Sequence, residues 1–236
     1  MDEAKPPGGL VQSLNAKVYG NGSETVVLAH DLMRHFKVVV YDLAFSAKVE
    51  SHVYDPKKYS SYYGYAEDLQ NLLDELHLEN IIFIGHSMAS MIGFINDKDY
   101  NGGFESSDTE EVFAAMKQDF SGWCPNFAAA IVGTNDSSAV EVYTESLASM
   151  EPDIALDVAR AVFLCDYRNI LEEVKVPCTI IQSEKDIDVP LSVVHYMKRK
   201  LGDYAKVEIM ETEGHLPMLT AHAMLLEVLK RVLSLN

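Results

Sequence analysis

One stretch of the sequence, IIFIGHSMASMIG (Ile81–Gly93), constrains the fold more than any other. Four apolar residues are followed by a Gly-His-Ser-Met-Ala turn and then by an apolar pattern typical of a helix. A serine in a sharp turn between a strand and a helix is typical of a nucleophile elbow. Such a turn needs small residues two before and two after the serine, and Gly85 and Ala89 meet that need. The stretch therefore predicts that Ser87 is a nucleophile, with a structural turn that carries an incidental serine as the alternative.

Strand and helix patterns alternate on both sides of this serine. Before it, Ala16–His30 reads as two strands with a Gly-Asn-Gly turn between them, which predicts a hairpin. A third strand is expected over Lys37–Asp42, and leucines at helical spacing predict a helix around Leu69–Leu76. Two further strands, each followed by a helix, are expected after residue 175. This alternation predicts an α/β fold with a mainly parallel sheet.

The pattern changes between residues 107 and 172, where helical periods follow one another with Gly or Pro between them. This segment is expected to be a lid of several short helices. The α/β core is then expected to comprise residues 11–106 and 173–236.

Charge and composition exclude two classes of partner. The net charge is −17, from 19 basic and 36 acidic residues, so phosphate backbones are repelled and nucleic acid is not an expected partner. No apolar run approaches the ~20 residues of a membrane span, and the first residues do not read as a signal peptide. The three cysteines have no metal-ligand spacing and their number is odd, which argues against a disulfide framework. No metal and no cofactor are expected.

A serine hydroxyl needs a base, and the base needs an orienting acid. In this type of architecture the chain order is serine, acid, histidine. Asp186 is expected in the loop after one late strand and His215 after the next, at the edge of the sheet where parallel strands end. Asp188 is the alternative acid. His86 precedes the serine and is better placed to line a pocket than to act as the base.

Several stretches resemble the plant α/β-hydrolases related to the strigolactone and karrikin receptors. They include GHSMASMIG, GWCPNFA, VPCTIIQSEKDIDVP and GHLPMLTAHAMLLEVLKRVL, and residues 41–61 look most like the third, least characterised branch. The resemblance covers nearly the whole chain after residue 10. It implies the α/β-hydrolase fold with a four-helix lid, the triad Ser87, Asp186 and His215, and the N–H of Met88 as an oxyanion donor.

The resemblance also implies a ligand and partners. Proteins of this family bind small molecules that contain a butenolide, and Trp123, Phe127 and Phe163 look like pocket-lining aromatics, with packing inside the lid as the alternative. The receptors hydrolyse their ligand slowly and then engage an F-box protein and repressor targets through the lid. They act without a cofactor, in the cytoplasm and nucleus.

The chain departs from the family pattern in two places, as if two internal segments were missing. Only seven residues, Asp31–Lys37, lie between His30, where one expected strand ends, and Val38 of the next, whereas a parallel crossover needs a dozen or more. The helix after Ser87 leads directly into NDKDYNGGFE, without the strand that the family has there. The first gap removes a loop that would supply one oxyanion donor, and the loss of one such donor costs on the order of 10²–10³ in rate.

Two functions follow from these observations. The first is a serine hydrolase, or a hydrolase-type receptor, for a small ester or lactone, which the complete triad favours. The second is a non-catalytic protein of the same fold that binds a small ligand or a protein, which the defective oxyanion hole favours.

Overall fold

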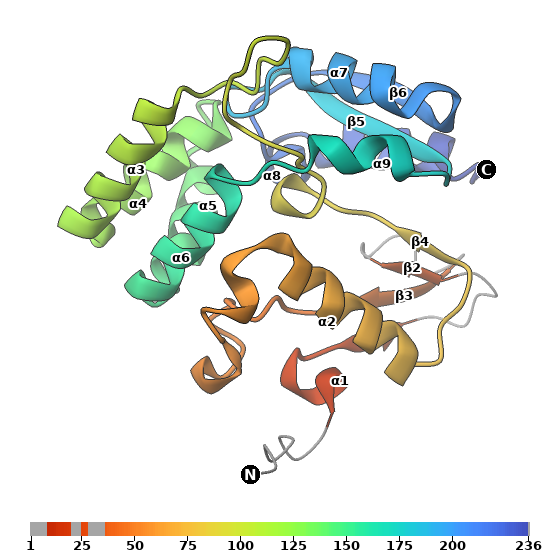
Figure 1. The fold of residues 1–236 in the computed structure, drawn as a ribbon, viewed down its shortest axis with the longest axis horizontal. Coiled ribbons are helices and arrows are strands. Elements are labelled where there is room, and N and C mark those ends of the chain that lie inside the picture. Colours follow the sequence, from red (N-terminus) through yellow and green to blue (C-terminus); the bar gives the residue numbers. More distant parts are fainter. Residues whose placement is uncertain (1–8, 20–24, 28–35, 236) are drawn as a thin grey trace. The chain divides into compact units, whose positions relative to one another are not determined.

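The computed structural model describes residues 9–19, 25–27 and 36–235. The chain divides into two compact units (Figure 1). The first comprises residues 1–91 with 153–161, and the second comprises residues 92–152 with 162–236.

The first unit contains a four-stranded sheet with the order β1-β3-β2-β4. Strand β3 runs antiparallel to β1, whereas β2 is parallel to both β3 and β4. Val38 and Val39 point to opposite faces of β3 and are both fully buried, as expected of a central strand covered on both sides. The strands are β1 (Lys17–Tyr19), β2 (Thr25–Val27), β3 (Lys37–Val40) and β4 (Ile81–Phe83).

The hairpin predicted for the first two strands is wrong. Strand β1 pairs with β3, with Val18 opposite Val39, so β3 lies between β1 and β2. The short apolar β3 is buried on both faces, as a strand in the middle of a sheet is. Burial of β3 between β1 and β2 outweighs the preference of the Gly-Asn-Gly sequence for a hairpin turn. That turn, residues 20–22, and the residues 28–35 that join β2 to β3 lie outside the described residues.

A buried polar anchor holds the predicted long helix, α2 (Tyr62–Glu75), to the loop before it. The carboxylate of Asp68 is buried in α2 and accepts hydrogen bonds from Lys58 Nζ and, at 2.6 Å, from Tyr59 Oη. The ring of Tyr59 packs between those of Tyr54 and Tyr65. The other short elements of this unit are α1 (Leu10–Ser13), η2 (Ser51–Val53), η3 (Lys58–Ser60) and η4 (Ser87–Ala89).

The second unit contains the predicted strand–helix–strand segment near the end of the chain. Strand β5 (Cys178–Lys185) is parallel to β6 (Ala205–Glu213), with Ile180 opposite Val207. Helix α7 joins the two strands, which confirms the crossover read from the sequence. The remaining elements are η5 (Arg168–Glu173), α7 (Leu191–Leu201), η6 (Gly202–Tyr204), α8 (Pro217–Thr220) and α9 (His222–Val232).

Four helices occupy the segment predicted to be the lid. Helices α4 and α5 lie side by side (Figure 1) and share a core that includes Cys124, Ala128 and Leu147. Aspartates cap both helices: Asp119 accepts a hydrogen bond from the N–H of Gly122, and Asp136 from that of Ala139. The four are α3 (Ser106–Gln118), α4 (Phe120–Val132), α5 (Ser137–Ala148) and α6 (Pro152–Phe163).

The helix predicted directly after Ser87 is wrong. A single 3-10 turn, η4, covers Ser87–Ala89. The chain then continues without a helix, and Ile92 O accepts a hydrogen bond from the N–H of Tyr167 at 2.7 Å. Every residue from Met91 to Phe94 is buried, so this stretch lacks the exposed face that a surface helix has.

The predicted α/β class with mainly parallel pairing is confirmed, because every described strand pair except β1 with β3 is parallel. Within the residues that the structure describes, no helix has the length and apolar character needed to cross a membrane.

Candidate active site

Ser87 lies in a strained turn at the end of β4. Its φ is 51°, in the left-handed region that non-glycine residues rarely adopt. Its carbonyl oxygen accepts hydrogen bonds from the N–H groups of Ser90 and Met91, both at 2.8 Å. Strain of this kind is concentrated at functional sites and is the backbone geometry that a nucleophile elbow requires.

The small residue two before the serine is a steric necessity. A Cβ on Gly85 would lie 2.5 Å from the carbonyl oxygen of Ala89, so any larger residue would force the turn apart. His86 and Met88, which flank Ser87, are partly buried and lie in the same turn. These residues belong to the first unit, whereas Asp186 and His215 belong to the second.

The predicted acid and base meet in the second unit. Nδ1 of His215 lies 2.8 Å from Oδ2 of Asp186, and both side chains are nearly fully buried. The other carboxylate oxygen of Asp186 accepts hydrogen bonds from the N–H groups of Asp188 at 2.9 Å and Val189 at 3.0 Å. Gln182 Nε2, on β5, donates to Oδ2 of Asp186 at 2.8 Å. The carboxylate is therefore fixed by donors on both of its oxygens.

The backbone next to His215 is anchored at two places. Gly214 donates to the carbonyl oxygen of Lys185 at 2.9 Å, and the N–H of His215 donates to Ile131 O at 3.0 Å. Gly214 has a φ of 84°, and a Cβ there would lie 1.9 Å from the carbonyl oxygen of Val132. The end of β5 and the last turn of α4 thus hold the backbone of His215 in place.

The electrostatics of the pair suit an orienting acid and a base. Burial raises the pKa of Asp186, but the hydrogen bond and charge of His215, with the N–H groups of Val189 and Asp188, outweigh it and lower that pKa. Burial lowers the pKa of His215, but its hydrogen bond to Asp186 and the charges of Asp188 and Asp186 raise it overall. The ionised Asp186 can only accept, so Nδ1 carries a proton and Nε2 is the basic nitrogen.

Asp188, the alternative acid, lies at the opposite nitrogen of the ring. Its Oδ2 is 3.7 Å from Nε2 of His215, and its side chain is buried. Its pKa is raised to about 6, because burial outweighs the lowering effect of the charge of His215 and the charge of Asp186 adds to the increase. The carboxylate at Nδ1 is thus that of Asp186, and the sequence carried no signal that Asp188 faces Nε2.

The predicted pocket aromatics are placed in packed clusters. Trp123 stacks on Phe127 with ring centroids 4.4 Å apart, and both pack against the core of α4 and α5. Phe163 is buried among the rings of Phe94, Phe104 and Phe113. Ring contacts of this kind fit both alternatives that the sequence left open, the lining of a pocket and packing inside the lid.

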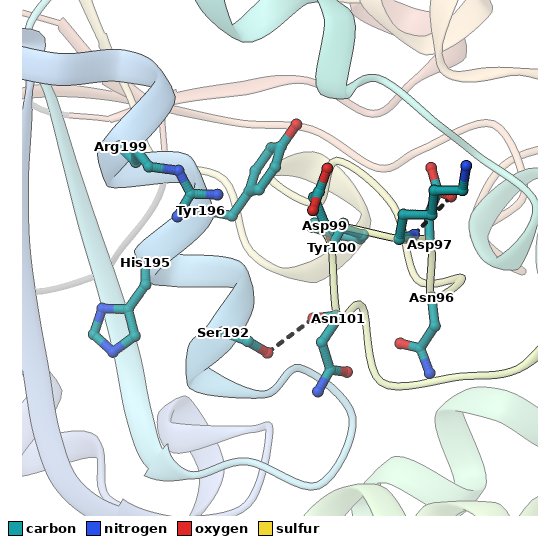
Figure 2. A pocket seen from close by; sticks show the side chains of 10 residues that line it. Asn96, Asp97, Asp99, Tyr100, Asn101, Ser192, His195, Tyr196 and Arg199 are labelled. Atoms are coloured by element: carbon teal, nitrogen blue, oxygen red, sulfur yellow. Dashed lines mark hydrogen bonds between the residues drawn. The ribbon is translucent and has the colours of Figure 1, made fainter.

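A hollow of about 570 Å³ lies elsewhere in the second unit (Figure 2). It is lined by the loop of residues 96–101 and by residues of α7, and Ser192 Oγ donates to Asn101 O across it at 2.8 Å. None of the predicted site residues lines it, and no motif in the sequence marked it.

Comparison with known proteins identifies close relatives. A strigolactone esterase of Arabidopsis thaliana is 35% identical, over 95% of this chain and 97% of the relative. A karrikin insensitive 2 receptor of Petunia hybrida is 37% identical, over 95% of this chain and 96% of the relative. No protein-family model matches the chain. The alignment with the Arabidopsis protein runs over 260 positions, more than the 236 residues of this chain, so internal parts of the relative have no counterpart here.

Solved structures agree on the fold. A hydrolase from Oleispira antarctica superposes with a TM-score of 0.90 at 29% identity, over 96% of this chain and 97% of that one. A bromoperoxidase from Bacillus anthracis, 18% identical, has a TM-score of 0.82 over 93% of this chain and 94% of its own. The predicted α/β-hydrolase fold is confirmed. The chain therefore belongs to the family of receptor-like α/β-hydrolases that contains the strigolactone esterases and the karrikin receptors.

Proposed function

We propose that the protein is a serine hydrolase, or a hydrolase-type receptor, that acts on a small ester or lactone such as a butenolide. The observation that carries the proposal is the buried pair of Asp186 and His215, joined at 2.8 Å. The left-handed backbone of Ser87 supports it, and so does membership of a family with named esterases.

The proposed chemistry uses the three residues in separate roles. Ser87 Oγ attacks the carbonyl carbon of the ligand, and Nε2 of His215 takes the hydroxyl proton. Asp186 keeps the proton of the imidazole on Nδ1 and stabilises the imidazolium that forms. The carbonyl oxygen becomes an oxyanion, towards which the N–H of Met88 donates.

The intermediate then collapses in two stages. The bond from the carbonyl carbon to the ester oxygen breaks, and His215 returns its proton to that oxygen, which leaves an acyl group on Ser87. Water attacks the acyl group with His215 as the base, and Ser87 is released. With a lactone, the alcohol formed in the first stage stays attached to the acyl group until water frees both together.

A fluorophosphonate probe tests the nucleophile directly. The probe should label the intact protein once, and Ser87→Ala should abolish labelling, because the probe traps only a serine activated by a base. Labelling is expected to be slow, because the sequence lacks the loop that supplies one oxyanion donor in the family, and one such donor is worth on the order of 10²–10³ in rate. Intact mass spectrometry measures how many probe molecules are attached, and in-gel fluorescence measures how fast they attach.

Ser90→Ala is the matched control, because Ser90 lies one turn away and its Oγ donates to the Ser87 carbonyl oxygen at 3.1 Å. This variant should label like the unchanged protein. A folded sample that does not label, or a Ser87→Ala variant that labels equally well, would contradict the hydrolase proposal.

A non-catalytic binding protein is the second candidate. The observation in its favour is that only one 3-10 turn, Ser87–Ala89, follows the elbow, where a longer helix would help to hold the serine and the N–H of Met88 in place. Ligand binding that persists in Ser87→Ala, without turnover in either protein, would favour this candidate.

Family membership is also the ground for the proposed partners and the pocket. The proposal includes a pocket lined by His86, Trp123, Phe127 and Phe163. It also includes docking of an F-box protein and repressor targets on the lid helices, and action in the cytoplasm and nucleus. A pull-down with the F-box protein, with and without a butenolide, measures the partner directly.

A further inference from the structure

A second carboxylate faces the basic nitrogen of the proposed catalytic histidine. Oδ2 of Asp188 lies 3.7 Å from Nε2 of His215, while Oδ2 of Asp186 lies 2.8 Å from Nδ1. The imidazole ring is therefore placed between two buried carboxylates, one at each nitrogen. The proposed hydrolysis uses only the first of them.

The two carboxylates differ in how their oxygens are satisfied. Asp186 accepts hydrogen bonds on both oxygens from two backbone N–H groups and from Gln182, besides its contact with His215. Asp188 is equally buried, yet its Oδ1 has no hydrogen-bond partner among the described residues. An ionised carboxylate with an unpaired buried oxygen is unfavourable. The positive charge of the His215 imidazolium therefore offsets the cost of burying the negative charge of Asp188.

Neither a structural role nor a metal site accounts for the buried carboxylate of Asp188. Its backbone N–H already serves the structure by donating to Asp186, and that bond needs no carboxylate on residue 188. The described residues contain no group of three or more His, Cys, Asp and Glu arranged to hold a metal ion. Among the described residues, the ion pair of the Asp188 side chain is the one with Nε2 of His215.

We propose that Asp188 is a positioning residue that holds a proton on Nε2 of His215, and so delays the action of His215 as a base until the pH rises. The inference rests on the proposed function, since it concerns the base of that reaction. Below the midpoint of the His215 titration, the ring is an imidazolium with protons on both nitrogens, and it cannot accept the proton of Ser87. Above the transition Nε2 releases its proton to water and becomes the base.

The charged and titratable groups around this pair come from three elements of the second unit. Asp186 and Asp188 lie in the loop after β5, and His215 follows β6. Among the described residues, Tyr143 on α5 is a third titratable neighbour of the pair. Burial and the charge of Asp188 raise the pKa of its hydroxyl. Both carboxylates favour the imidazolium, and Tyr143 is neutral at the pH values concerned.

Nuclear magnetic resonance of the histidine ring tests the inference without any need for activity. The Cε1–H and ring nitrogen signals of His215, assigned from their loss in His215→Asn, are followed from pH 4 to pH 9. In Asp188→Asn the midpoint of the His215 titration should fall by at least about one pH unit, because an opposite charge within 4–6 Å changes a pKa by about 1–3 pH units. Asp203→Asn is the matched control, since Asp203 is exposed. In this variant the midpoint of the His215 titration should equal that of the unchanged protein.

The pH profile of hydrolysis gives the second readout. The acidic limb of kcat/KM should move to lower pH in Asp188→Asn by the same interval as the midpoint. At a pH well below the original limb, the variant should then be about tenfold faster for each pH unit by which the limb moves. A purely structural role for Asp188 predicts lower activity at every pH and no such gain.

The outcomes separate this inference from the proposed function. A His215 midpoint that is the same in Asp188→Asn and in Asp203→Asn would overturn the inference, whether or not the protein hydrolyses esters. A fall in the midpoint without any hydrolysis would support the pairing and contradict the hydrolase proposal. If Asp188→Asn does not fold, the unchanged protein decides: two coupled inflections of His215 are expected, and a single inflection near the ordinary value of about 6.5 would refute the pairing.

Discussion

Asp186→Asn should lower kcat for ester hydrolysis by on the order of 10⁴ and leave KM nearly unchanged. The carboxylate of Asp186 accepts from Nδ1 of His215 at 2.8 Å and so keeps Nε2 available as the base. An asparagine at this position can turn its amide N–H towards Nδ1, which moves the ring proton to Nε2 and removes the base. The effect on kcat is large because the loss concerns the proton transfer and not ligand binding.

The measurement is steady-state hydrolysis of a simple aryl ester, with circular dichroism to show that the variant folds. Asp188→Asn is the matched control, because it makes the same chemical change two residues further along the same loop. It should gain activity at low pH, whereas Asp186→Asn should lose activity at every pH. A kcat within tenfold of the unchanged protein in Asp186→Asn would show that Asp186 does not orient the base.

The meeting of Asp186 and His215 could be predicted from the sequence because it depends on simple topology. Each residue follows a strand, and the two strands are consecutive and joined by one helix, so the strands are parallel and end at the same edge. The register of β5 with β6 then brings the loops together. The turn at Ser87 could be predicted for a similar reason, since the need for glycine at position 85 is local.

Features that depend on distant parts of the chain could not be predicted. A Gly-Asn-Gly turn indicated a hairpin, but β1 pairs with β3, because pairing is decided by which strand the whole unit buries. The apolar stretch after Ser87 has a helical period, but residues 91–94 are buried all round, and Ile92 bonds to Tyr167. Such a contact spans most of the helical segment and leaves no local signal.

The position of Asp188 shows the same limit at the site itself. The sequence placed two aspartates in one loop and could not tell which one faces which nitrogen of the histidine. The choice is made by the turn of the loop, in which Asp186 accepts from the N–H groups of Asp188 and Val189. The side chain of Asp188 is then free to reach Nε2.

Gly214→Ala should destabilise the second unit by roughly 2–5 kcal/mol, because it adds backbone strain to a steric overlap. Gly214 has a φ of 84°, and the added Cβ would lie 1.9 Å from Val132 O and 2.9 Å from its carbonyl carbon. Both neighbours are backbone atoms of α4, so no side chain can turn away to relieve the overlap. The loss is a large part of the ~5–15 kcal/mol that stabilises a typical domain.

Gly202→Ala is the matched control for this substitution. Gly202 also has a positive φ, 58°, but nothing lies within 4 Å of the position of its Cβ, so only the backbone strain of about 1–3 kcal/mol remains. Urea unfolding measures the stability of both variants. It is followed by the fluorescence of Trp123, which is the one tryptophan in the sequence and lies on α4. Equal losses in the two variants would show that α4 yields to the added carbon. We expect a larger loss of stability in Gly214→Ala than in Gly202→Ala. We also expect slower hydrolysis by the fraction of Gly214→Ala that stays folded, because the N–H of His215 donates to Ile131 O and so moves with the same turn of α4.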